Sequence, residues 1–264
     1  MLKIKENIPL VSVVMNCFNG ERYIKESINS VMKQTYQNWE LIIFDNFSDD
    51  GSKKIIDEYT KDKRIKYFKS KSHLKLYDAR NQAVNLSSGK FICFLDTDDI
   101  WIKDKIEKQI KYINENKIFD LIYSNYFIKQ NNSQKLKIKF KEKLPEGNIT
   151  TNLLKDYKVG ILTILIKREV FKFLNFNKNY EIIGDFDFVI SLSKKKKIGS
   201  IQEPLAIYRD HKDNTSKKKI DLYIKEVSSW IKDNEVNLRI FSNLFNLKFY
   251  LFKLKIKKFL KYNH

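Results

Sequence analysis

The chain contains few of the residues that build linkers, disulfide frameworks and membrane spans. Its 264 residues include 7 Gly, 3 Pro and 2 Cys, which argues against a linker-rich or low-complexity chain. Cys17 and Cys93 lie in or beside apolar segments, so we expect buried thiols rather than a disulfide framework. The longest apolar run, residues 159–166, is too short to cross a bilayer, and residues 1–10 lack the apolar stretch of a signal peptide. These absences predict a globular cytoplasmic protein.

Arginine is also scarce, although the formal net charge is +19. The 51 basic residues are nearly all lysines, whereas base readout and bidentate phosphate contacts favour arginine. We therefore expect no nucleic-acid partner. The positive charge is concentrated in residues 248–261, where six lysines occur with no acidic residue among them.

What the chain does contain is enough apolar residues for a core and a regular alternation of strands with helices. Hydrophobic residues make up 42% and aromatic residues 14% of the composition, which suits one domain of good size. Continuous apolar runs predict parallel strands covered on both faces, at residues 11–15, 39–45, 64–70 and 91–96. Helices are expected between them, at about 21–34, at 52–62, and at 77–89 with a glycine C-cap.

The pattern after residue 101 is less regular. It predicts helices at 104–115, 168–174 and from Gly184 onward, strands at 119–128 and 161–167, and an exposed hairpin or loop at 129–143. Residues 202–219 are expected to form a loop and a short strand, and the chain is helical in pattern from Ile220. We place a domain boundary near 216, which divides the chain into a main α/β domain, 1–216, and a basic amphipathic helical extension, 217–264.

Three acids follow the apolar run at residues 91–95. Carboxylates as close as Asp96, Asp98 and Asp99 raise one another's pKa and need a compensating cation. Two of them on one side of a turn suit Mg²⁺ or Mn²⁺, which also binds phosphate oxygens, so a diphosphate is the natural partner. The alternative is that Asp98 or Asp99 caps the following helix.

Two further acids lie where a ligand or a reaction would need them. Asp45 ends the strand at 39–45, and ligands of parallel sheets bind at the carboxyl ends of strands. Its alternative role is in the turn that follows. Asp185 follows Gly184 at a helix start, where it is either a helix cap or a general base.

The motifs in residues 11–52, 78–101 and 184–192 occur in the same order as in glycosyltransferase family 2. The resemblance covers about residues 9–211. It implies a GT-A fold, a Rossmann-like mixed sheet that is mostly parallel and flanked by helices. It also implies an inverting transfer of sugar from a nucleoside-diphosphate sugar, with UDP as the family's usual nucleotide.

The resemblance assigns roles to the acids and to one arginine. Asp45 matches the acid that contacts the nucleotide base, and Arg80 matches a basic residue that meets the nucleotide or its diphosphate. Asp96 and Asp98 match the family's ribose and metal motif, with Asp98 as the more direct metal ligand.

The remaining implied roles concern the base and a histidine. Asp185 matches the second acid of the family's Glu-Asp pair, the catalytic base, and Gly184 stands where the family usually has the Glu. This departure leaves Asp187 as an alternative base, although a first-turn acid can simply interact with the helix dipole. His211 resembles a histidine near the diphosphate or the metal, or is an exposed loop residue.

The implied reaction has defined partners. The acceptor would be a hydroxyl of a glycan or a lipid-linked saccharide, with Mn²⁺ or Mg²⁺ as cofactor, in surface polysaccharide or glycoconjugate synthesis. The basic tail either lies on an anionic membrane surface or forms a helical cap with solvated lysines. Two other functions stay open: a haloacid-dehalogenase-type phosphatase with Asp96 as nucleophile, and a basic nucleic-acid-binding module.

Overall fold

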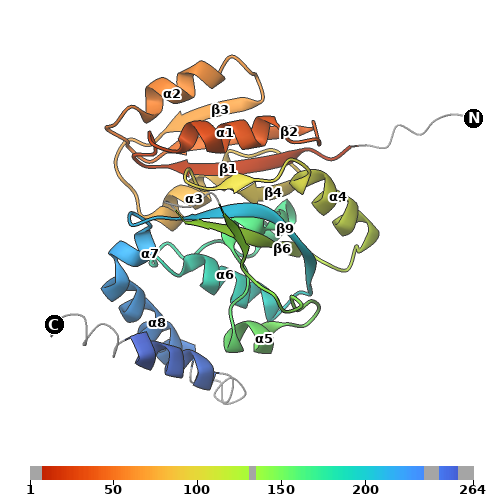
Figure 1. Cartoon of the computed structure of the whole chain (residues 1–264), viewed down its shortest axis with the longest axis vertical. Coiled ribbons are helices and arrows are strands. Elements are labelled where there is room, and N and C mark those ends of the chain that lie inside the picture. The colour runs from red at the N-terminus through yellow and green to blue at the C-terminus, as the bar shows by residue number, and fades with distance from the viewer. Residues whose placement is uncertain (1–7, 131–134, 235–243, 255–264) are drawn as a thin grey trace, which may run out of the picture.

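The computed structural model describes residues 8–130, 135–234 and 244–254, and Figure 1 shows their arrangement. The first half of the sheet is parallel, because each strand is followed by a helix that returns the chain to the same edge. In space its strands run in the order β3, β2, β1, β4. They are β1 (Val11–Cys17), β2 (Trp39–Asp45), β3 (Ile65–Lys69) and β4 (Phe91–Phe94).

The second half of the sheet mixes directions. Over the described residues the sheet has nine strands, and β4 is followed in space by β8, β6, β9 and β5, with β7 beside β6. The pairs of β8 with β4 and with β6 are antiparallel, and β6 runs parallel to β9. These strands are β5 (Ile100–Trp101), β6 (Leu121–Gln130), β7 (Leu136–Ile138), β8 (Leu165–Lys167) and β9 (Ile198–Asp210).

Helices cover both faces of the sheet. One face packs against α1 (Ile24–Met32), α2 (Ser52–Tyr59) and α4 (Lys105–Glu115). The other packs against α3 (Leu76–Asn85), α5 (Thr150–Lys155), α6 (Gly184–Ser193) and α8 (Ile220–Asn234). Shorter helices are η1 (Ile161–Thr163), η2 (Arg168–Lys172) and α7 (Thr215–Lys218). Because both faces are covered, adjacent residues such as Val13 and Val14 are both buried, in different clusters.

The predicted strands and helices occur in the expected order, although β5 and α5 were not predicted, and three predictions need correction. The strand expected within residues 202–219 begins earlier and is longer than predicted, since β9 runs from Ile198 to Asp210, and the short helix α7 follows the loop after it. The helix at 77–89 ends earlier, at Asn85, with Leu86 as its C-cap. Gly89 instead allows the chain to pass close to β1, because a Cβ there would lie 2.6 Å from the Ser12 nitrogen. The strand expected at 161–167 begins with the turn η1. The expected hairpin is present, as β7 pairs with β6.

The C-terminal segments pack on the same core as the sheet. Val227 and Trp230 of α8, together with Leu244 and Leu251, are buried in the cluster that contains Phe94 of β4. The division of the chain at residue 216 stays a prediction. No helix in the described ranges combines the length and apolarity that a membrane crossing requires.

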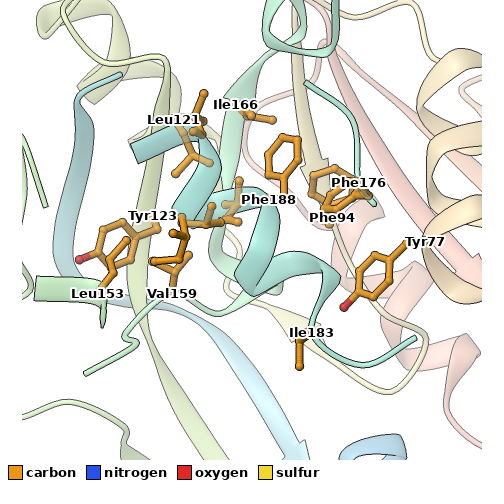
Figure 2. Packing of buried hydrophobic residues seen from close by; sticks show 14 of the residues in the cluster. Tyr77, Phe94, Leu121, Tyr123, Leu153, Val159, Ile166, Phe176, Ile183 and Phe188 are labelled. Carbon is orange, nitrogen blue, oxygen red and sulfur yellow. The ribbon is translucent and has the colours of Figure 1, made fainter. Parts of the chain in front are cut away.

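An aromatic cluster joins the sheet to α3 and α6 near the strand ends (Figure 2). Phe176 stacks on Phe188 of α6 with ring centroids 4.5 Å apart and on Tyr77 of α3 at 5.6 Å. The ring of Phe94 meets Phe176 edge-on at 5.4 Å. These contacts hold the N-terminus of α6 against α3.

Gly184 is the residue that lets this approach happen. A Cβ at Gly184 would lie 2.4–2.6 Å from three ring atoms of Tyr77, a side chain only 2% exposed. Tyr77 therefore occupies the space into which a side chain at position 184 would extend.

We expect Gly184→Ala to destabilise the protein by about 1–3 kcal/mol through overpacking. This outweighs the alanine propensity gain of about 1 kcal/mol or less, because the Tyr77 ring cannot move without disturbing Phe176. Denaturant unfolding of Gly184→Ala, Tyr77→Ala and the double variant measures the effect. If the two side chains clash, Gly184→Ala should lower the free energy of unfolding clearly less in the Tyr77→Ala background than in the wild type. Additive effects of the two substitutions would contradict a clash.

Candidate active site

The candidate site lies at the carboxyl ends of β1, β2 and β4. The loops after β1 and β2 are tied together, because Ser48 Oγ accepts a hydrogen bond from the Asn19 N–H (3.0 Å) and Ser52 Oγ accepts one from the Gly20 N–H (2.8 Å). Asn19 and Phe47 have φ values of 52° and 70°. A positive φ is costly for phenylalanine, and Phe47 nevertheless presents an exposed ring at this edge.

Asp45 is wholly buried at the end of β2. Its Oδ1 accepts a hydrogen bond from the Ser48 N–H (2.8 Å), and its Oδ2 accepts one from the Tyr67 hydroxyl (2.6 Å). These are the contacts of a turn residue. The role of Asp45 in contacting a nucleotide base stays a prediction.

The positive charge that compensates Asp96 is the side chain of a buried arginine. Its Oδ1 accepts a hydrogen bond from Arg80 Nη2 at 2.7 Å. The Arg80 side chain is 2% exposed, whereas the Asp96 side chain is 36% exposed. Arg80 lies within 6 Å of the ring centroids of Tyr77, Phe94 and Phe176. Arg80 is thus a buried support that aims the Asp96 carboxylate outward.

Asp98 contacts His211, the residue that comes directly after β9. His211 is buried rather than exposed in a loop, with its Nε2 2.9 Å from Asp98 Oδ2. The Asn214 amide is 3.5 Å from the same oxygen. Burial raises the pKa of the Asp98 carboxyl, the Asp96 charge raises it further, and the bond to His211 acts in the opposite direction.

Asp99 is buried, and its Oδ1 accepts a hydrogen bond from the Arg209 N–H of β9 at 3.1 Å. Burial raises its pKa well above the ordinary aspartate value. The expectation that Asp98 or Asp99 caps the next helix is wrong. The strand β5 follows the acids, and the N-cap of α4 is Asp104.

Asp185 lies in the first turn of α6, whose N-cap is Ile183, so Asp185 is not the cap. Its Oδ1 accepts hydrogen bonds from the Tyr77 hydroxyl (3.1 Å) and from the Phe186 N–H (2.8 Å). Burial of the carboxyl raises its pKa, and the nearby Arg80 guanidinium counteracts part of that rise. A carboxylate whose pKa is raised accepts a proton more readily than an ordinary aspartate.

Asp187 is directed elsewhere. Its Oδ1 accepts a hydrogen bond from the Trp230 indole N–H of α8 at 2.8 Å. Burial raises the pKa of Asp187 and this bond opposes the rise. The geometry therefore favours Asp185 over Asp187 as the acid near Arg80 and Asp96.

Two supporting residues were not predicted from the sequence. Tyr77 holds Asp185, and Glu226 of α8 accepts hydrogen bonds from the backbone N–H groups of residues 181, 182 and 183 at 2.7, 3.0 and 3.1 Å. A carboxylate that accepts three consecutive N–H groups before a helix acts as a cap supplied from outside. The Gly184 departure from the family pattern marked this place in the sequence, but the contact with Tyr77 is visible only in the structure.

The acids are not assembled into a three-ligand metal site. Asp98 and His211 bond to each other, whereas Asp96 turns to Arg80. No group of three or more His, Cys, Asp and Glu side chains within the described ranges is arranged to hold a metal ion. The assignment of Asp96, Asp98 and His211 to a metal ion stays a prediction.

The residues present nevertheless suit a cation whose ligands would come partly from the protein and partly from a substrate. The carboxylates of Asp96 and Asp98 repel each other, which a nearby cation would relieve. His211 Nδ1 is buried and has no hydrogen-bond partner among the described residues. Carboxylate oxygens and an imidazole suit Mn²⁺, and phosphate oxygens would complete the coordination.

The mixed sheet, mostly parallel and flanked by helices, has the GT-A architecture that the resemblance in the sequence implied. The chain belongs to glycosyl transferase family 2, whose family model matches residues 12–183. It is a glycosyltransferase, and so neither a phosphatase nor a non-catalytic module.

Two bacterial relatives carry informative names. The chain is 38% identical over 192 residues to "UDP-Glc:alpha-D-GlcNAc-diphosphoundecaprenol beta-1,3-glucosyltransferase WfgD" of Escherichia coli, with 73% of each chain covered. It is 35% identical over 162 residues to the "Putative teichuronic acid biosynthesis glycosyltransferase TuaG" of Bacillus subtilis, with 61% of this chain and 63% of the other covered.

Solved structures share the fold. TarS 1–349 of S. aureus in complex with UDP-GlcNAc superposes with a TM-score of 0.66 at 18% identity, over 84% of this chain and 66% of that one. The mannosyltransferase PcManGT of Pyrobaculum calidifontis, in complex with GDP-Man and Mn²⁺, gives a TM-score of 0.63 at 15% identity, over 86% and 65%. The present chain thus spans about two thirds of the length of these structures.

Proposed function

We propose that the chain transfers a sugar, with inversion, from a UDP-sugar to a hydroxyl of a lipid-linked saccharide or another glycan. The observation that carries the proposal is the position of Asp185. It is a partly buried carboxylate of raised pKa, and the charges of the Arg80–Asp96 pair at the carboxyl edge of the sheet act on it. A base and a place for a cation that neutralises the departing diphosphate are the two elements that this single displacement needs.

In the proposed step, the Asp185 carboxylate takes the proton of the acceptor hydroxyl. The acceptor oxygen forms a bond to the anomeric carbon of the donor, and the bond from that carbon to the diphosphate oxygen breaks with its electron pair going to the diphosphate. The Tyr77 hydroxyl can donate to Asp185 Oδ1 or to the Ile182 carbonyl oxygen at 2.9 Å, so it can release the carboxylate when the proton arrives.

The nucleoside diphosphate would lie over the loops after β1 and β2 and beside Asp96. Arg80 supports this side indirectly, through Asp96, and Asp45 supports the loop that would contact the base. A divalent cation, Mn²⁺ or Mg²⁺, would be held by Asp98 with His211 and Asp96 nearby. Such a cation supplies positive charge that stabilises a departing diphosphate.

The acceptor class and the location are inferred from the relatives. The names of WfgD and TuaG refer to a diphosphoundecaprenol-linked saccharide and to teichuronic acid. We infer a role in surface polysaccharide synthesis, with a lipid-linked acceptor and a peripheral position on the inner face of the cytoplasmic membrane.

Calorimetry of nucleoside diphosphates, with and without Mn²⁺, tests the donor site. We expect UDP to bind in a metal-dependent way, and Asp98→Ala to weaken binding in Mn²⁺ by about tenfold or more, because one ligand of the cation is removed. Asp57→Ala is the matched control, since Asp57 is exposed on α2 and pairs with Lys53. Metal-independent binding, or equal loss in both variants, would contradict the assignment.

A further inference from the structure

The helix formed by residues 244–254, here called the C-terminal helix, has apolar side chains on two opposite sides. Its inner side is seated on the protein core, where Leu244 is 0% and Leu251 5% exposed and Leu247 packs against the same cluster. Burial of the inner side explains why the helix lies where it does. It does not explain the residues on the other side.

The outer side carries an aromatic stripe made of Phe245, Phe249 and Phe252, whose exposed fractions are 68%, 48% and 58%. Their spacing of four and three residues places them on one helix face. The rings of Phe245 and Phe249 are stacked with centroids 6.4 Å apart, and Lys253 Nζ lies 4.4 Å from the centroid of Phe249. Neighbouring exposed aromatic rings of this kind mark an interaction surface.

The charge of the segment selects the kind of partner. Residues 244–254 contain two lysines and no acidic residue, and the sequence adds four more lysines and no acid between residues 255 and 261. A second copy of this chain, with a net charge of +19, would be repelled. An anionic lipid surface attracts the lysines and accepts aromatic rings at its headgroup boundary.

We propose that the aromatic stripe of the C-terminal helix is the surface through which this protein docks onto an anionic membrane. The inner leucines anchor the helix to the enzyme, so that the phenylalanines insert without unfolding the domain. Leu244 and Leu251 of the C-terminal helix lie in the same core cluster as Val227 of α8, and Figure 1 shows the two helices next to each other. Helix α8 also carries Glu226, which accepts hydrogen bonds from the segment before Asp185. Docking would thus place the catalytic domain at the surface where a lipid-linked acceptor lies, and in that respect it rests on the proposed function.

Vesicle co-sedimentation of the full chain tests the proposal without any sugar nucleotide or acceptor. The vesicles contain either phosphatidylcholine alone or phosphatidylcholine with phosphatidylglycerol. We expect binding to the anionic vesicles, and a loss of about tenfold or more in the variant with Phe245→Ser, Phe249→Ser and Phe252→Ser, because each ring contributes buried apolar area. The control is Ile118→Ser, which removes a side chain 64% exposed elsewhere on the protein.

The outcomes separate this proposal from the catalytic one. Equal binding by the triple variant and the wild type, or no binding by either, overturns the docking surface while leaving UDP binding to be judged by calorimetry. A third outcome is that the wild type sediments as a dimer and does not bind vesicles, whereas the triple variant is monomeric. A second copy of the chain would then cover the stripe, and this result also overturns the proposal. The inner leucines are unchanged, so circular dichroism should report a folded triple variant.

Discussion

Asp185→Asn is expected to lower kcat by about a hundredfold to ten-thousandfold, the usual contribution of a general base, while the protein becomes more stable near neutral pH. The asparagine keeps an oxygen that can accept the bonds from Tyr77 and Phe186, so the local structure should persist. Its amide cannot take a proton from an acceptor hydroxyl. Steady-state kinetics and denaturant unfolding of the same samples measure both effects.

The sign of the stability change follows from the direction of the pKa shift. Burial raises the Asp185 pKa above the ordinary 3.8, so the folded protein binds this proton more tightly than the unfolded chain does. The ionised carboxylate therefore costs stability in full at every pH above its folded pKa; the cost decreases as the pH falls through that pKa and is gone below the unfolded value of 3.8. Activity has the opposite dependence: the acid limb of kcat/KM should lie above pH 3.8.

Asp187→Asn is the matched control, because Asp187 is on the same helix and bonds to Trp230. It should keep most of the activity. A large loss in Asp187→Asn together with an active Asp185→Asn would exchange the roles of the two acids.

Glu226→Ala is expected to destabilise the protein by about 3 kcal/mol, because three buried or partly buried N–H groups lose a charged acceptor. These groups belong to residues 181–183, directly before α6. We also expect kcat to fall, since Asp185 is held by the first turn of the same helix. Chemical unfolding and kinetics at a temperature where the variant is folded measure the two effects.

Two companion variants sharpen the result. Glu226→Gln retains an acceptor oxygen and should recover part of the stability and of kcat. Asp233→Ala removes the same charge from α8 as Glu226→Ala does, but at an exposed position. Its free energy of unfolding should lie within about 0.5 kcal/mol of the wild-type value. If Glu226→Ala behaved like Asp233→Ala, the cap supplied by α8 would be unimportant.

The strands of the parallel half could be predicted because their signal is local. The run at 39–45 coincides with β2, Trp39–Asp45, since a strand buried on both faces is apolar throughout. The length of strand β9 was underestimated, because polar residues and Pro204 interrupt its apolar pattern. Pro204 pairs with Asn125 at an irregularity in the register with β6, and such a bulge tolerates a residue that cannot donate to the ladder.

By itself, the sequence determined the family, the parallel half of the sheet and the acids at its strand ends, because contiguous residues encode all three. Only the tertiary structure decided which partner each acid meets. Asp98 is joined to His211 across 113 positions and Asp185 to Tyr77 across 108, while Glu226 comes from α8 to cap α6. The physical reason is that these bonds depend on the order of the strands and on which helices cover each face. Those arrangements result from packing of the whole core, and no local pattern of residues encodes them.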